Sequence, residues 1–144
     1  MAGLVDVGIS AMTPEQTAVS QHASALRRIW SGEIRSSGRV KKSAFLPRKD
    51  GQDRDGFSVS IESAEHSRLH RELFETHGHR ACQIRVAAIR ELDPLDVIHA
   101  PEQNDPMHAL IIGMPDRTNG PDELAKVEYL ADELAKRAAP YTFK

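Results

Sequence analysis

The sequence predicts an α+β protein: a small mixed or antiparallel sheet of about four or five strands with about three helices packed on it. Three observations lead to this prediction. The 144 residues amount to a single domain, and the hydrophobic content of 40% is ordinary for a globular chain. Helical and strand-like periods also follow one another without the regular alternation of a βαβ fold. We expect the helices to lie on one face of the sheet.

We expect a loose N-terminal tail at residues 1–12 and a single globular domain at residues 13–144. The tail lacks the basic start and the apolar core of a secretory signal. No apolar run approaches the roughly 20 residues of a membrane helix. The one cysteine, Cys82, fits a reducing compartment. The sequence therefore predicts a cytoplasmic protein that makes no membrane contact.

The first helix is predicted over residues 13–31. Thr13 can cap it, Pro14 suits the first helical position, and Gln16 completes a capping box. The Ser31-Gly32 step ends it. Its apolar positions form one broad face: Ala18, Val19, Ala25, Leu26, Ile29 and Trp30.

Two strands and a second helix are predicted next. A short strand near residues 42–46 ends at Pro47. Residues 57–61 alternate apolar and polar side chains, which is the period of a half-buried strand. Residues 63–77 show a helical period and lead into a His-Gly-His break.

The last third of the chain predicts three strands and a final helix. The strands cover residues 82–89, 95–98 and 108–113, the last of them buried at the centre of the sheet. The helix is capped at Asn119 or Gly120, begins at Pro121 and stops before Pro140. Its core stripe contains Leu124, Val127, Ala131, Leu134 and Ala138.

Charge is concentrated in residues 27–54. This stretch holds nine basic and three acidic residues, a net charge of +6, although the whole chain carries −2. A solvated loop that pairs with the acidic remainder would explain it, and so would a surface that binds phosphate or an acidic partner. A single aromatic residue, Phe45, gives no stacking platform for unpaired bases.

Our first functional hypothesis is a non-enzymatic accessory protein that binds its partner through residues 32–54. The partner would be an acidic protein surface or a nucleic-acid backbone, because either would pair with a basic segment. No cofactor is expected, and the sequence leaves the oligomeric state open. The candidate binding residues are Arg39, Lys41, Lys42, Arg48 and Lys49.

The second hypothesis is a small enzyme, a transferase or hydrolase that acts on a phosphate-bearing substrate. His99 closes one predicted strand and His108 opens the next. If these strands pair antiparallel, the two imidazoles could meet at one end of the sheet and supply acid–base chemistry. Arginines of the basic loop would hold the anion. Each histidine could equally be a polar strand terminus.

The third hypothesis is a metal site. His66, His70, His79 and Cys82 lie close in sequence, and the two histidines four residues apart share a helix face. Imidazole and thiolate together suit zinc. The spacing matches no zinc-finger or HExxH motif, so capping and core roles would explain the same residues.

Two stretches carry a family resemblance. One contains Ser43-Ala44-Phe45-Leu46, Asp53 and Asp55-Gly56-Phe57-Ser58-Val59, and the other runs from Asp105 to Gly113. Together with the final helix they resemble small uncharacterised bacterial proteins of similar length. In these proteins a Ser-Ala-Phe segment precedes a Ser-Val strand and a His-Ala segment precedes the last helix. The resemblance implies bacterial origin and no activity. It suggests that five residues belong together in the fold: Phe45, Asp55, Ser58, His108 and Gly113.

Overall fold

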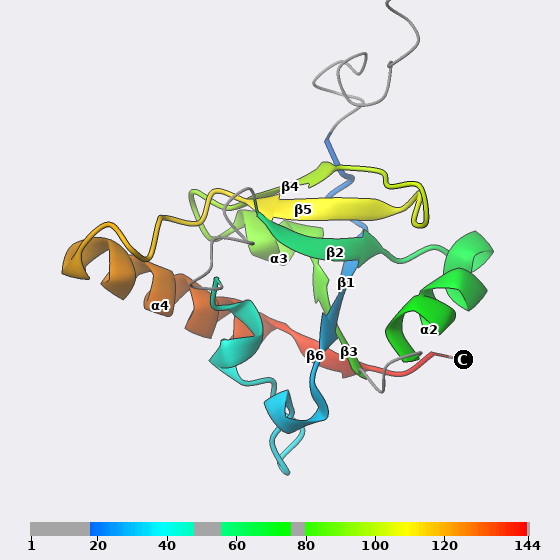
Figure 1. Cartoon of the computed structure of the whole chain (residues 1–144), viewed down its shortest axis with the longest axis horizontal. Helices are drawn as coiled ribbons and strands as arrows, with labels where there is room; N and C mark the ends of the chain where they lie inside the picture. Colours follow the sequence, from blue (N-terminus) through cyan, green and yellow to red (C-terminus); the bar gives the residue numbers. More distant parts are fainter. Residues whose placement is uncertain (1–17, 48–55, 76–79, 144) are drawn as a thin grey trace, which may run out of the picture.

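The computed structural model describes residues 18–47, 56–75 and 80–143. Its centre is a six-stranded antiparallel sheet in the order β4-β5-β2-β1-β3-β6 (Figure 1). The strands are β1 (Ser24–Ile29), β2 (Phe57–Ile61), β3 (Arg80–Arg85), β4 (Asp96–His99), β5 (His108–Ile112) and β6 (Ala139–Tyr141). The α+β class is confirmed, with a sheet slightly larger than the predicted one.

Three α-helices and three short 3-10 turns are described with the sheet. The α-helices are α2 (Ser67–Glu75), α3 (Val86–Arg90) and α4 (Pro121–Arg137). The 3-10 turns are η3 (Ser31–Glu33), η4 (Lys42–Phe45) and η5 (Ala64–His66). Figure 1 shows α2 and α4 at opposite sides of the molecule, with the sheet between them.

The helices cover both faces of the sheet, which corrects the expected one-sided arrangement. Ala25 lies opposite Ile61 on β2 and Ile84 on β3, and all three belong to the main core. Because neighbouring strand residues point to opposite faces, Leu26 faces the other side. There it packs with Phe74 of α2 and Phe143 in a second, smaller core. The sheet is therefore the middle of three layers.

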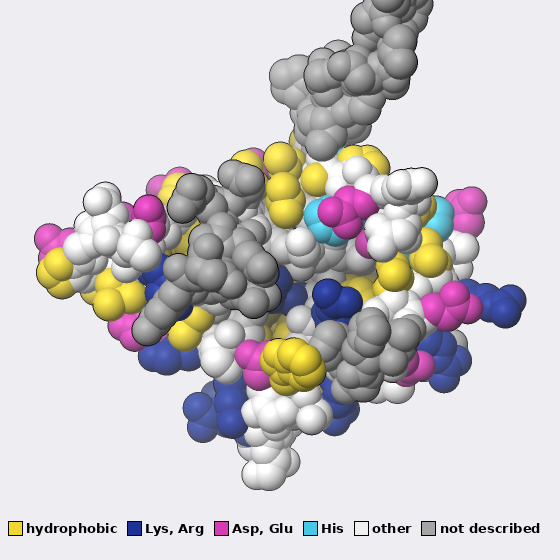
Figure 2. All heavy atoms as spheres, in the orientation of Figure 1, with side chains coloured by type: hydrophobic (Ala, Val, Ile, Leu, Met, Phe, Trp, Pro, Cys, Tyr) yellow, Lys and Arg dark blue, Asp and Glu magenta, His cyan; other side chains and the backbone are white. Residues whose placement is uncertain are grey.

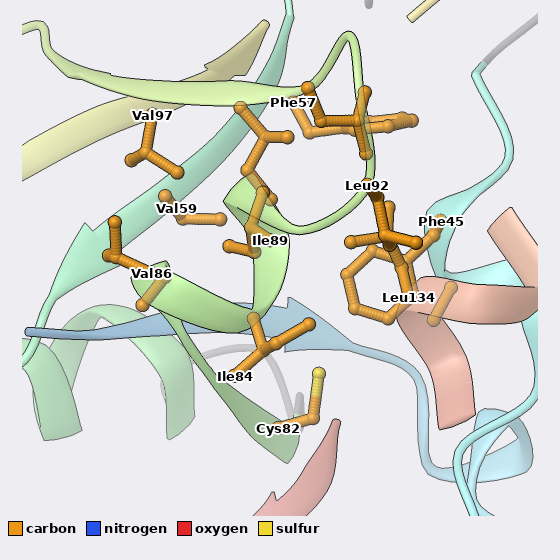
Figure 3. Packing of buried hydrophobic residues seen from close by; sticks show 14 of the residues in the cluster. Phe45, Phe57, Val59, Cys82, Ile84, Val86, Ile89, Leu92, Val97 and Leu134 are labelled. Carbon is orange, nitrogen blue, oxygen red and sulfur yellow. The ribbon is translucent and has the colours of Figure 1, made fainter. Parts of the chain in front are cut away.

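The main core lies between the sheet and the helices α3 and α4. Figure 3 shows Leu134 of α4 beside Phe45 of η4, and Ile89 of α3 near Val59 and Ile84 of the sheet. Each of these side chains is 4% exposed or less. Burying a side chain of this size stabilises the fold by about 1.5–3 kcal/mol.

The predicted first helix is wrong over its described part. Residues Ser24–Ile29 form β1, which pairs with β2 on one side and β3 on the other. Apolar residues at 25, 26 and 29 suit a helix face, but they also suit a strand that is buried on both faces. Pairing with two neighbouring strands decides between the two. The capping signal at residues 13–16 lies outside the described residues.

Two other elements differ from their prediction. Residues Lys42–Phe45 form the 3-10 turn η4, where a strand was expected, and both Ala44 and Phe45 are buried. The predicted strand at 82–89 ends at Arg85, where Val86 starts the short helix α3. In each case a run of apolar residues fits two kinds of element. Contacts with α4 favour the 3-10 turn η4, and contacts with β4 favour the helix α3.

The remaining predicted elements are present. β2, β4, β5 and α4 lie where the periodicity puts them, and α2 occupies most of the predicted helix at 63–77. The strand β6 was missed, because Pro140 indicated only the end of a helix. Proline is tolerated there because β6 is an edge strand, next to β3 alone.

Candidate functional site

Residues 34–40, in the middle of the basic stretch, form a tight turn between η3 and η4. Ile34 and Val40 form an antiparallel bridge, and the Arg35 backbone N–H donates to the Arg39 carbonyl at 2.7 Å. The Gly38 N–H donates to the Arg35 carbonyl at 2.8 Å. Gly38 has φ of +86°, a conformation that favours glycine. The turn therefore holds the exposed Arg35 and Arg39 opposite one another on its two arms.

This turn and the C-terminal half of α4 enclose a hollow of about 1100 Å³, here called the arginine hollow. From the turn it is lined by Arg35, Ser37, Gly38, Arg39, Val40 and Lys42, and from α4 and β6 by Glu128, Tyr129, Asp132, Ala135, Lys136, Ala138, Ala139 and Pro140. Figure 2 shows dark-blue Lys and Arg side chains gathered around the lower tip of the molecule, where Figure 1 places the turn.

The four cations of the arginine hollow differ in their partners. Lys42 Nζ lies 3.7 Å from Glu128 Oε1, and Lys136 Nζ lies 3.2 Å from Asp132 Oδ2. Within residues 18–47, 56–75 and 80–143, neither Arg35 nor Arg39 has a carboxylate partner. The hollow thus carries two positive charges in excess, both on the turn.

The structure places the predicted binding residues differently. Arg39 and Lys42 line the hollow. Lys41 is exposed but lies outside the lining, and its backbone N–H donates to the Glu33 carbonyl at 2.8 Å. Arg48 and Lys49 lie outside the described residues.

Lys136 and Tyr129 line the hollow from α4, more than 80 residues after the turn in sequence, and sequence reasoning missed them. The positive charge of Lys136 and the exposure of both residues were readable from the helix pattern. Their position next to the turn was not, because only the packing of η4 against α4 brings the two together.

One cation of the basic stretch has a structural role. The Arg27 guanidinium lies 5.7 Å from the ring centre of Phe45 and 4.7 Å from that of Phe57. Its Nε donates to the Ala44 carbonyl at 2.7 Å and its Nη1 to the Ser58 carbonyl at 3.0 Å. Arg27 therefore ties η4 to the sheet, so it is part of the frame that holds the hollow.

His99 and His108 lie on adjacent antiparallel strands, but the register does not bring them together. His99 is opposite Ala109 on β5, so these two side chains lie on the same face of the sheet. His108 precedes Ala109 on β5 and therefore points to the other face. The His108 ring is buried, and its Nδ1–H donates to the Ala100 carbonyl at 2.7 Å. Neither histidine lines the arginine hollow or the smaller hollow next to Tyr129. This geometry gives no support to an acid–base pair.

A buried polar cluster lies beneath α2, and sequence reasoning did not find it. The Ser60 hydroxyl donates to Asp105 Oδ2, and the Met107 backbone N–H donates to Asp105 Oδ1 at 3.0 Å. His70 Nε2 lies 3.6 Å from Asp105 Oδ1 and has no hydrogen-bond partner among the described residues. All three residues of the cluster (Ser60, His70 and Asp105) are 4% exposed or less.

The cluster can hold charge but has no access to a substrate. Burial lowers the pKa of His70, and the neighbouring Asp105 carboxylate opposes that effect. Ser60 bonds the carboxylate and not the imidazole, so the three side chains do not have the Ser-His-Asp order of a catalytic triad. The arrangement is therefore that of a buried structural network.

The predicted metal ligands do not converge. The rings of His66 and His70 are 6.3 Å apart, but Cys82 belongs to the main core on the opposite face of the sheet. Burial raises the pKa of the Cys82 thiol to about 12, which keeps it protonated. His79 lies outside the described residues. In the part of the chain that is described, no three His, Cys, Asp or Glu side chains are arranged to hold a metal ion.

Comparisons with known proteins give no relative. No protein-family model, no curated protein and no solved structure matches the chain. Among the residues described, no helix has both the length and the apolar character needed to cross a membrane.

Proposed function

We propose that this protein is a binding protein that holds an acidic segment of a partner protein in the arginine hollow. One observation carries the proposal: Arg35 and Arg39 face a hollow with no carboxylate partner in the described chain, although the two lysines beside them are paired. Guanidinium groups bind carboxylates through two parallel hydrogen bonds. Two arginines on the arms of one turn therefore suit two carboxylates of a peptide.

The acidic residues of the same hollow favour a protein partner over nucleic acid. Glu128 and Asp132 line the wall opposite the arginines. A nucleic-acid backbone carries a phosphate charge at every step, so it would place phosphates against these carboxylates. An acidic peptide can direct its few carboxylates to the turn and leave α4 to uncharged residues. The net charge of −2 for the whole chain also disfavours a polyanion.

The electrostatic contribution is limited because the turn is exposed. Two unit charges 4 Å apart in water attract by about 1 kcal/mol. Two arginines then contribute about 2 kcal/mol at low salt, and screening weakens this further. The charges therefore set the partner's type and speed its approach, and they supply only part of the affinity.

The test is binding of a fluorescein-labelled Gly-Ser peptide that carries two glutamates, followed by fluorescence anisotropy from low to physiological salt. We expect binding to weaken as salt rises. The double charge reversal Arg35→Glu/Arg39→Glu should weaken it at least tenfold, which is about 1.4 kcal/mol. The matched control is Arg68→Glu/Arg71→Glu on α2, which makes the same change in net charge at two exposed arginines far from the hollow.

Equal losses in the two double variants would show a general charge effect and refute the site. A labelled DNA duplex forms the second arm of the experiment. If the duplex binds more tightly than the peptide and depends on Arg35 and Arg39, the partner class is nucleic acid and the proposal is wrong.

A further inference from the structure

A second hollow lies beside the first, on the other side of the exposed ridge of α4. It has a volume of about 530 Å³ and is here called the proline hollow. Its apolar wall consists of Pro94, Pro115, Ala125, Tyr129 and Leu130. Its charged residues are Asp93, Glu123 and Lys126. Lys126 Nζ lies 3.5 Å from Glu123 Oε1, so the charges of these two side chains offset each other. The proline hollow is thus apolar where the arginine hollow is cationic.

Tyr129 is the residue that the two hollows share. It is 62% exposed, and it is one of only two large hydrophobic side chains exposed to this degree among the described residues. At 100° per residue, Tyr129 points away from the buried stripe of Val127, Ala131 and Leu134. Tyrosines in such positions often dominate binding, because the ring offers a large apolar area with little entropy to lose.

We infer that the acidic partner segment also carries an apolar anchor, which enters the proline hollow after the segment has crossed Tyr129. This inference rests on the proposed function and adds the second determinant of the partner. The charge pattern supports it: acidic residues fit the side with Arg35 and Arg39, and an uncharged side chain fits the side walled by prolines.

The width of α4 sets the spacing of the two determinants. A helix with its side chains is about 10–12 Å across. An extended chain advances about 3.3 Å per residue. The carboxylates and the anchor should therefore be separated by about three or four residues, and an anchor directly next to the carboxylates should not reach the proline hollow.

The experiment compares three labelled peptides with the same two glutamates. The first has a phenylalanine after a three-residue Gly-Ser spacer, the second has serine in place of the phenylalanine, and the third has the phenylalanine directly after the glutamates. We expect the first to bind at least tenfold more tightly than either of the others.

Two variants test where the anchor binds. Tyr129→Ala removes the shared ring, and Ala125→Gln fills the proline hollow with a polar side chain. Both positions are exposed on α4, and both new residues are compatible with a helix. Each variant should reduce the advantage of the first peptide to less than threefold, and Tyr129→Phe should restore it.

The outcomes separate the two proposals. If all three peptides bind alike and still require Arg35 and Arg39, the anchor does not exist and the proposed function stands. If the advantage persists in both Tyr129→Ala and Ala125→Gln, the anchor binds elsewhere and the inference is wrong. If none of the peptides requires the two arginines, the proposed function itself fails.

Discussion

Replacing Asp105 by asparagine should destabilise the protein, because Asp105 is the centre of the buried polar cluster. It accepts hydrogen bonds from the Ser60 hydroxyl and the Met107 backbone N–H, and His70 Nε2 lies 3.6 Å away. The amide has nearly the shape of the carboxylate, so packing is preserved. One of its two polar atoms, however, becomes a donor that faces another donor.

The magnitude follows from these contacts. A buried hydrogen bond to a charged group contributes about 1.5–3 kcal/mol, against about 1 kcal/mol for a neutral one. Asp105→Asn weakens two such bonds, but it also removes the cost of burying a charge. We therefore expect the free energy of unfolding to fall by about 1.5–3 kcal/mol.

Urea denaturation followed by circular dichroism measures this change. Fluorescence is less suitable, because the single tryptophan, Trp30, is 64% exposed. The matched control is Asp116→Asn. Asp116 Oδ1 also accepts two hydrogen bonds, from the Thr118 N–H at 2.9 Å and its hydroxyl at 2.7 Å, but the residue is exposed. It should cost less than about 1 kcal/mol.

A double-mutant cycle with Ser60→Ala isolates the direct contact. The coupling between the two positions should be about 1 kcal/mol or more, because the two groups share one hydrogen bond. Equal losses for Asp105→Asn and Asp116→Asn, or a coupling near zero, would refute the reasoning that burial gives the cluster its importance.

Three further predictions concern single buried or strained positions. Burial lowers the pKa of His70 below 6.5, so the unfolded chain takes up a proton before the folded one and stability falls on acidification below pH 6.5. His70→Gln should flatten this slope by up to about 1.4 kcal/mol per pH unit, and an unchanged slope in urea titrations would contradict it. Gly113→Ala should lower stability by about 2 kcal/mol or more, because φ is +99° and a Cβ would lie 2.3 Å from the Pro94 carbonyl oxygen. Gly32→Ala, with open space around it, is the control, and equal thermal shifts would be the contrary result. The buried Cys82 thiol, its pKa raised to about 12, should react with a disulfide reagent at pH 8 only as fast as the protein unfolds. Rapid labelling of the folded protein would show that it is accessible.

The sequence predicts the elements whose period allows one interpretation. α4 has a proline start, acidic residues in its first turn and basic residues in its last, and its stripe is that of a helix alone. β2 and β5 lie within the residues predicted for them. In these segments the residue types, the apolar period and the signals at the ends all favour the same element. The fold class, which depends on these elements, is therefore confirmed.

The sequence fails where apolar residues suit two elements. Ala25, Leu26 and Ile29 line a helix face as well as they fill both sides of β1. Only pairing with β2 and β3 selects the strand, and these partners come more than 25 residues later. Such non-local pairing overrides local helix signals.

The candidate site is predicted in part for the same reason. The surplus of positive charge near Arg39 is visible in the sequence, but its partners in the hollow, Tyr129 and Lys136, come from α4. Ser60, His70 and Asp105 are likewise separated by up to 45 residues, and no motif links them. The charge of a segment can be read from its own residues. Which residues from distant segments come to lie beside it depends on the fold.

The most direct test of the central claim is a ¹⁵N–¹H correlation spectrum of the protein titrated with an unlabelled Gly-Ser peptide that carries two glutamates. We predict that the backbone signals of Gly38, Tyr129 and Lys136 shift in step, because they lie on both walls of the arginine hollow. The signals of α2 should stay in place. Shifts confined to α2, or none at millimolar peptide, would contradict the claim that this hollow binds an acidic segment.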